Sequence, residues 1–238
     1  MIKYPAFFSL FILCLISCKE VSRNHANASL SNPHKLSSKM EGKAPVPQLL
    51  DTAAINLPDT SFVDVTLFSK QIIPDIRYAT KNNFTRTQLY PCAKCLLRYK
   101  ILKALLHAES MFLKRGFRIK VFDCYRPLSV QKKLWEKVPV PGLVANPATG
   151  SRHNRGSAID LTLTDMLGNE LDMGTDFDDF SYKGKTFCKT LPDTVKKNRM
   201  LLRSVMQAAG FAGINSEWWH FLYVGKKRYK LSNHSLCD

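Results

Sequence analysis

The stretch GSRHNRGSAIDLTL, residues 150–163, decides how this 238-residue chain is interpreted. A short apolar run from Ala158 to Leu163 predicts a buried strand, yet it carries a carboxylate near its start, Asp160. His153 precedes that carboxylate by seven residues, and Gly156 between them lets the chain turn tightly. Core strands rarely begin with such polar groups, so the stretch indicates a functional site.

A second polar pair lies far along the chain, in EWWHFLYV at residues 217–224. His220 joins His153 and Asp160 to give two imidazoles and one carboxylate, a ligand set suited to one Zn²⁺ per chain with a fourth position left for water. The remaining positive charge of the ion would acidify that water. Glu217 would then be the general base.

This site sets a geometric condition, because residues three apart in an ideal strand face opposite sides. Glu217 and His220 can share a site only if the chain bends or bulges at Trp218–Trp219. Taken singly, the three ligand candidates could be a loop cap, a turn residue and a packed strand histidine. Their combination with Glu217 is what indicates metal chemistry.

The remaining patterns predict an α+β fold, a single domain with a largely antiparallel sheet flanked by helices. Apolar spacings of three, four and seven predict a helix over 100–116, and alternation predicts a strand over 117–122. We also expect helices over 127–138 and 192–210, a turn at Gly168–Asn169 leading to a partner strand, and a closing strand over 217–224. The composition, 45% apolar and 23% charged, excludes a chain disordered throughout.

The N-terminus predicts export. Residues 1–17 have an apolar run too short to span a bilayer, and LISC at residues 15–18 resembles a lipoprotein signal in which Cys18 is lipidated. Plain secretion with cleavage nearby is the alternative. Residues 18–57 are predicted to be a flexible tether and residues 58–238 the folded domain, which places the protein outside the cytoplasm and on a membrane through Cys18.

The net charge of +16 indicates anionic surroundings such as lipid headgroups or wall polymers, or simply a basic solvated surface. We expect no nucleic-acid partner, because the basic residues are scattered and the chain is exported. The domain holds five cysteines, so at least one is unpaired within a monomer. Cys92 and Cys95 form a C-x-x-C without a second one, which favours a local disulfide, or two packed thiols, over a zinc ribbon.

Together, Ser151-x-His153-x-x-Gly156-x-Ala158-x-Asp160 and Glu217-Trp218-Trp219-His220 resemble the zinc D,D-peptidases. The likeness is greater to the D-alanyl-D-alanine dipeptidases of the vancomycin-resistance type and runs from about residue 62 to 224. It also covers DIRYATKNNFT (75–85), DCYRP (123–127), GSAIDLTL (156–163) and MGTDFD (173–178).

The resemblance implies a role for each matching residue. It makes His153, Asp160 and His220 the zinc ligands, Glu217 the base and Arg126 the group that stabilises the oxyanion. It places Tyr78 and Asp178 near the amino end of the substrate and Ser151 in the pocket wall. Arg126 could instead pair structurally with a carboxylate such as Asp123, and Tyr78 and Asp178 could be a core hydroxyl and a cap.

The implied activity is hydrolysis of D-Ala-D-Ala or a similar D,D-dipeptide in cell-wall peptide turnover. A carboxylate at the ammonium end would select a free N-terminus. A D,D-carboxypeptidase or endopeptidase acting on stem peptides and a non-catalytic wall-binding lipoprotein are the alternatives. Two departures from the family pattern, Cys124 beside Tyr125 and a short segment over 135–151, predict a different pocket rim.

Overall fold

The computed structural model describes residues 56–226 and 228–237. The predicted signal peptide, the lipidation site Cys18 and the tether up to residue 55 lie outside the described residues. Within the described part of the chain, no helix combines the length and the apolar character needed to cross a membrane.

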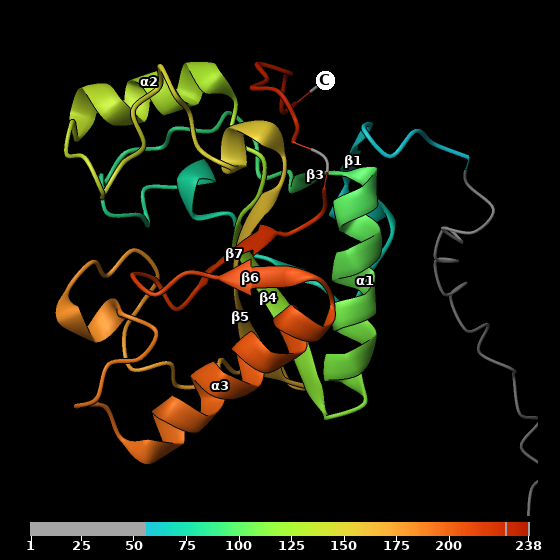
Figure 1. Cartoon of the computed structure of the whole chain (residues 1–238), viewed down its shortest axis with the longest axis vertical. Helices are drawn as coiled ribbons and strands as arrows, with labels where there is room; N and C mark the ends of the chain where they lie inside the picture. The colour runs from blue at the N-terminus through green and yellow to red at the C-terminus, as the bar shows by residue number, and fades with distance from the viewer. Residues whose placement is uncertain (1–55, 227, 238) are drawn as a thin grey trace, which may run out of the picture. The chain divides into compact units, whose positions relative to one another are not determined.

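A five-stranded sheet forms the centre of the domain (Figure 1). Its spatial order is β2 (Ile73–Pro74), β4 (Phe117–Asp123), β5 (Ala158–Asp165), β7 (His220–Tyr223) and β6 (Phe211–Gly213). Only the β2–β4 pair is parallel, and the other three pairs are antiparallel. The predicted α+β fold with a largely antiparallel sheet is therefore confirmed. A separate antiparallel pair joins β1 (Phe62–Asp64) to β3 (Leu96–Arg98).

Three α-helices accompany the sheet, close to their predicted positions: α1 (Tyr99–Leu113), α2 (Leu128–Lys137) and α3 (Asp193–Ala208). Helix α1 contacts β4, α3 contacts β6, and the two helices contact each other. Figure 1 shows α2 apart from them, at the other end of the sheet. Pro127 stands immediately before α2, where its missing N–H costs no helical hydrogen bond.

Strand β5 is buried on both faces. Side chains alternate along a strand, so Ile159, Leu161 and Leu163 share one face, and Asp160 and Thr162 share the other. The register sets Asp160 opposite both His220 on β7 and Asp123 on β4. The central strand thereby brings polar groups from three strands to one place.

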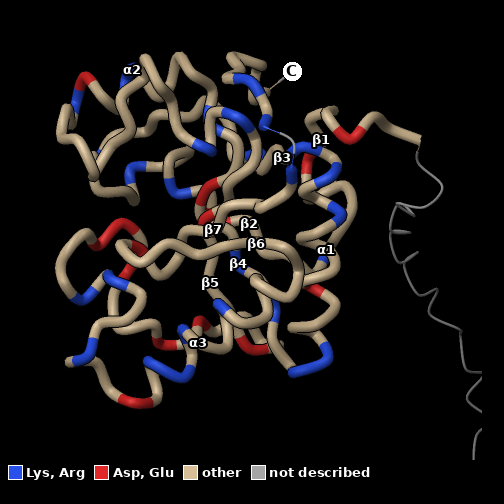
Figure 2. Tube along the Cα trace, viewed as in Figure 1, with Lys and Arg blue, Asp and Glu red and all other residues tan. Residues whose placement is uncertain are grey.

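The turn predicted at Gly168–Asn169 forms, with the Asp165 N–H donating to the Asn169 carbonyl. The partner strand predicted after it is wrong, since the pairing is reduced to one bridge between Thr164 and Glu170. The chain then leaves the sheet and runs as a loop to the short 3₁₀ helix η4 (Tyr182–Gly184). Figure 2 shows Lys and Arg spread along the described chain rather than gathered on one element.

Among the described residues two disulfides form, Cys92–Cys237 and Cys95–Cys124. The local Cys92–Cys95 disulfide is therefore a wrong prediction. Cys92 instead bonds to the C-terminal segment, and Cys95 bonds to the residue that follows β4, so each cysteine pairs with a distant part of the chain. Cys188 stays free and buried, which confirms that the odd count leaves one cysteine unpaired.

Candidate active site

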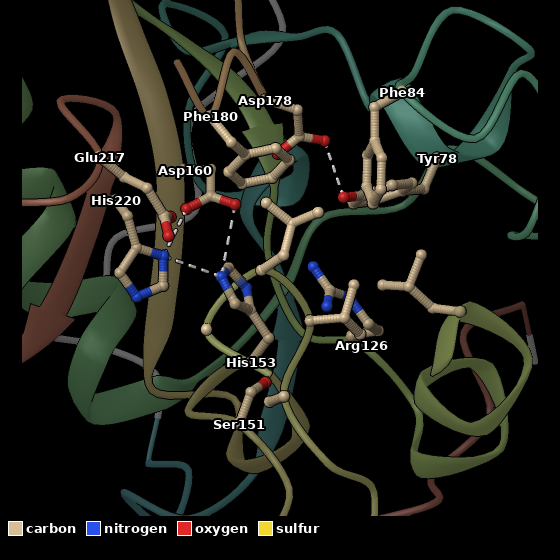
Figure 3. A pocket seen from close by; sticks show the side chains of 15 residues that line it. Tyr78, Phe84, Arg126, Ser151, His153, Asp160, Asp178, Phe180, Glu217 and His220 are labelled. Carbon is tan, nitrogen blue, oxygen red and sulfur yellow. Dashed lines mark hydrogen bonds and ion pairs between the residues drawn. The ribbon is translucent and has the colours of Figure 1, made fainter. Parts of the chain in front are cut away.

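All eight predicted site residues line one pocket of about 240 Å³ (Figure 3). The eight are Tyr78, Arg126, Ser151, His153, Asp160, Asp178, Glu217 and His220. Apolar side chains complete the wall: Phe84, Leu134, Leu143, Val144 and Phe180. Leu143 and Val144, in the segment before Ser151, form part of this rim, and its difference from the family pattern stays a prediction.

The two histidines and Asp160 converge on one point, with one ligand atom from each lying within 4.8 Å of the others. His220 Nδ1 lies 2.7 Å from Asp160 Oδ1 and 3.2 Å from His153 Nε2. The other carboxylate oxygen, Oδ2, lies 3.3 Å from His153 Nε2. Burial alone would raise the pKa of Asp160, but the two imidazoles hold it well below its ordinary range. The group therefore offers a charged carboxylate and two ring nitrogens, as a zinc site requires.

His153 reaches this group from the 3₁₀ helix η3 (His153–Arg155), which ends at Gly156. Gly156 has φ +66°, and a Cβ there would lie 2.5 Å from a ring carbon of Phe62. Only glycine fits this tight return to β5. On the far side of the imidazole, Nδ1 lies 2.6 Å from the Cys124 carbonyl oxygen. A carbonyl only accepts, so Nδ1 carries the proton and Nε2 is the nitrogen left for a metal.

The bend required before His220 is present. Strand β7 begins at His220, while Trp218 and Trp219 form a bend that buries both indoles. The Trp218 indole N–H donates to Thr175 Oγ1 at 2.9 Å, which fixes the bend to a neighbouring loop. Figure 3 shows the Glu217 carboxylate beside Asp160 and His220. Burial raises the pKa of Glu217, which favours uptake of a proton.

Arg126 is buried, and three hydrogen bonds hold its guanidinium. Its guanidinium donates to Asp123 Oδ2 at 2.7 Å, to Gln131 Oε1 at 3.0 Å and to Tyr90 Oη at 3.4 Å. The structural pairing with Asp123 is thus real, and Arg126 lines the pocket as well. Burial would lower the pKa of Arg126, but the charge of Asp123 raises it well above its ordinary value. The cation is therefore permanent and held in one orientation.

Tyr78 and Asp178 lie side by side at the pocket wall, with the phenol donating to Asp178 Oδ2 at 2.8 Å. Asp178 has φ +60°, a left-handed backbone that aspartate adopts at some cost. Burial first, and then the negative charge of Asp160, raise the pKa of Asp178 well above its usual range. A cation entering the pocket would stabilise this carboxylate. At another part of the wall, the Ser151 N–H donates to Asn154 Oδ1 at 2.7 Å.

Several supporting residues were not assigned a site role from the sequence. Asp123 accepts from Arg126 and from the Tyr90 hydroxyl, and Asn154 Nδ2 donates to the Arg126 carbonyl at 2.8 Å. The supporting role of Asp123 could have been inferred from the sequence, because an acid at the end of an apolar strand is expected to be buried and then needs a partner. Tyr90 and Gln131 carried none, since nothing local distinguishes them from ordinary polar residues.

The comparisons with known proteins agree with this geometry. The family described as D-Ala-D-Ala dipeptidase, peptidase family M15, matches residues 59–235. The chain belongs to this family. All eight predicted site residues fall within the matched range, and so do the supporting residues Asp123 and Asn154.

Three relatives named D-alanyl-D-alanine dipeptidase illustrate the likeness. The one from Escherichia coli is 38% identical over 162 residues, which cover 68% of this chain and 84% of the relative. The one from Enterococcus faecium is 30% identical over 62% of this chain and 84% of its own length. The one from Streptomyces coelicolor is 29% identical over 68% of this chain and 90% of its own length.

Proposed function

We propose that this protein is a zinc-dependent dipeptidase that hydrolyses D-alanyl-D-alanine, or a similar D,D-dipeptide, in cell-wall peptide turnover. The convergence of His153, Asp160 and His220 beside Glu217 and Arg126 in one small pocket carries the proposal. A pocket of about 240 Å³ has room for a dipeptide rather than for a long wall peptide. Membership of the dipeptidase family supports the choice of substrate.

The three ligand residues would hold one Zn²⁺ per chain through His153 Nε2, His220 Nδ1 and an Asp160 oxygen. A zinc ion bound there would supply Lewis-acid chemistry toward water and the peptide carbonyl. The donor set fits the ion for two reasons. The Asp160 carboxylate stays negatively charged although it is buried, and His153 carries its proton on Nδ1, so that Nε2 has a free lone pair.

Glu217 would take the proton from the attacking water and pass it to the leaving amine. Its raised pKa suits a group that must both accept and return a proton near neutral pH. Arg126 would donate to the oxygen on which negative charge develops during attack. Because Asp123, Gln131 and Tyr90 hold its guanidinium, little reorganisation is needed as that charge appears.

Asp178, oriented by Tyr78, would bind the free ammonium group of the substrate. A nearby ammonium ion would stabilise the charged form of the Asp178 carboxyl, whose pKa burial and the charge of Asp160 raise in the free protein. A substrate with a blocked amino end would bury this carboxyl without an ammonium group to neutralise it, so the pocket would reject it. Ser151 would line the wall beside the substrate.

We further propose that the protein acts outside the cytoplasm, attached to a membrane through a lipidated Cys18. The sequence of residues 1–18 supports export, and the two disulfides of the folded domain suit an oxidising compartment. The substrate would then be dipeptide or small peptide released during wall turnover. Fractionation of cells tests this placement, and recovery of the mature chain in the cytosol would contradict it.

The activity is tested by measuring D-alanine released from D-Ala-D-Ala, with added zinc and with a chelator. N-acetyl-D-Ala-D-Ala and a stem peptide ending in D-Ala-D-Ala serve as the blocked substrates. We expect zinc-dependent cleavage of the free dipeptide alone. Cleavage of the blocked substrates would identify a D,D-carboxypeptidase or endopeptidase, and a zinc-loaded protein that cleaves none of them would favour a wall-binding role.

A further inference from the structure

The Cys95–Cys124 disulfide lies directly behind the metal-binding group. We propose that it is a positioning element of the zinc site, which holds the Cys124 carbonyl against His153 and thereby sets the affinity for the ion. This inference rests on the proposed function, since it concerns the same ligands. It assigns a role to Cys124, the residue of DCYRP (123–127) that departs from the family pattern.

The contact between Cys124 and His153 carries the first step. The Cys124 carbonyl accepts from His153 Nδ1 at 2.6 Å, and both residues are buried. This bond fixes the tautomer and the rotation of the ring, so Nε2 points at Asp160 and His220. Partners of this kind influence metal affinity strongly, because a ligand free to rotate must be ordered when the ion binds.

The second step concerns what holds that carbonyl in place. Strand β4 ends at Asp123, and its register with β5 shifts between Val121 and Asp123, so the ladder does not extend to Cys124. The anchor is the segment at the start of β3 instead. The disulfide joins Cys124 to Cys95, and the Tyr125 N–H donates to the Leu96 carbonyl at 2.9 Å.

The third step is that the anchored segment and the loop of His153 contact each other at three points. Besides the imidazole contact, the Arg126 N–H donates to the His153 carbonyl at 3.1 Å, and Asn154 Nδ2 donates to the Arg126 carbonyl at 2.8 Å. The Cys124 N–H also donates to Asp123 Oδ1 at 2.9 Å, which orients the partner of Arg126. Loss of the covalent link at Cys124 should therefore loosen His153 first and Arg126 second.

The other disulfide provides a matched control. Cys92–Cys237 ties the C-terminal segment to the chain before β3, and the Cys92 sulfur contacts the Leu236 carbonyl. It closes a loop of 145 residues, compared with 29 for Cys95–Cys124. Its removal should therefore destabilise the fold at least as much, while leaving the Cys124 carbonyl in place.

The test compares two double variants of the whole protein, Cys95→Ala with Cys124→Ala, and Cys92→Ala with Cys237→Ala. Zinc affinity is measured by competition with a chromophoric chelator, and circular dichroism establishes that each variant is folded. We expect the first variant to bind Zn²⁺ about 10- to 100-fold more weakly than the unchanged protein. The second variant should bind as tightly as the unchanged protein.

A second readout needs no metal. With ¹⁵N-labelled histidine, the Nδ1–H proton of His153 should give a protected downfield signal in the zinc-free protein. That signal should broaden or vanish in the Cys95/Cys124 variant and persist in the control. If the double variant does not fold, Cys95→Ala alone cuts the link and keeps the Cys124 side chain.

The positioning role would be overturned if both variants bound zinc as tightly as the unchanged protein, or if both lost affinity to the same extent. The first result would show that the Cys124 carbonyl needs no covalent anchor. The second would show that each disulfide affects zinc affinity only through the stability of the fold. Failure of the unchanged protein to bind zinc would instead overturn the proposed function itself.

Discussion

Paired strands supply two of the three proposed metal ligands, whereas Tyr78 and Asp178, at the other end of the pocket, lie in short turns. Asp160 and His220 face each other in the register of β5 and β7, and the tight turn at Gly156 brings in His153. At the other end, Tyr78 lies in the 3₁₀ helix η2 (Arg77–Ala79), and Asp178 occupies a left-handed position in a loop.

This difference separates the chemistry of the site from its selectivity. Hydrogen-bonded strands hold their side chains at a constant separation, which suits ligands that must meet one ion within a few tenths of an ångström. Loops can change length and direction without disturbing the sheet, so the residues that recognise the substrate are easier to alter. Changes at the metal end should therefore abolish the reaction, and changes at the loop end should alter which substrate reacts.

The largest effect is expected at the metal end, from Glu217→Gln. This change keeps the shape of the side chain and removes its ability to accept a proton, so the rate of D-Ala-D-Ala hydrolysis should fall by about 10²- to 10⁴-fold. Zinc affinity, measured by chelator competition, should stay the same because Glu217 is not in the proposed ligand set. A variant with near-normal turnover would show that Glu217 is not the base.

Arg126 lies between the two ends, with its guanidinium carbon 5.0 Å from the centre of the Tyr78 ring. Arg126→Lys keeps the buried positive charge that Asp123 needs, but it loses the fork that also engages Gln131. We expect kcat to fall by about 10²- to 10³-fold with little change in KM. A rise in KM at constant kcat would assign Arg126 to substrate binding rather than to the developing charge.

At the loop end, Asp178→Asn should change selectivity more than turnover. The ratio of kcat/KM for D-Ala-D-Ala to that for N-acetyl-D-Ala-D-Ala should fall by about tenfold or more, equivalent to about 1.4 kcal/mol. Asp179→Asn is the matched control, because Asp179 is the next residue and does not line this pocket. Equal effects of both changes would remove Asp178 from substrate recognition.

The smallest effect is expected away from both ends, at Glu109 on α1. Burial raises the pKa of Glu109, so the folded state binds this proton more tightly than the unfolded state does. The stabilisation by protonated Glu109 is complete at a pH below the pKa of Glu109 in the unfolded chain. It is lost as the pH rises through the higher pKa of Glu109 in the folded protein. Glu109→Gln should therefore raise the melting temperature at pH 7 by about 1 to 3 °C.

This gain should shrink as the pH falls toward 4, and hydrolysis should be unaffected at any pH. The amide oxygen of the glutamine can still accept from the Ser69 hydroxyl, as Glu109 does. A melting temperature that falls at pH 7 would mean that the charged carboxylate is stabilising after all.

Much of the site could be predicted from the sequence because its signals are local. The motif around His153 and Asp160 lies within eight residues, and the condition that Trp218–Trp219 must bend follows from strand geometry alone. Helices α1 and α3 could be predicted because their buried faces repeat every three to four residues. The partner strand predicted after Gly168 does not form beyond one bridge, because a local turn signal does not show how far the chain after it stays paired.

The sequence alone predicted which residues would carry the chemistry: the ligand types, their order and the carboxylate beside the second histidine. How these groups are supported depends on the tertiary fold. The pairing of Cys95 with Cys124, the carbonyl that orients His153 and the network of Asp123, Tyr90 and Gln131 around Arg126 all join distant segments. Such contacts leave no periodic trace, because each depends on where the whole chain places two residues rather than on their neighbours.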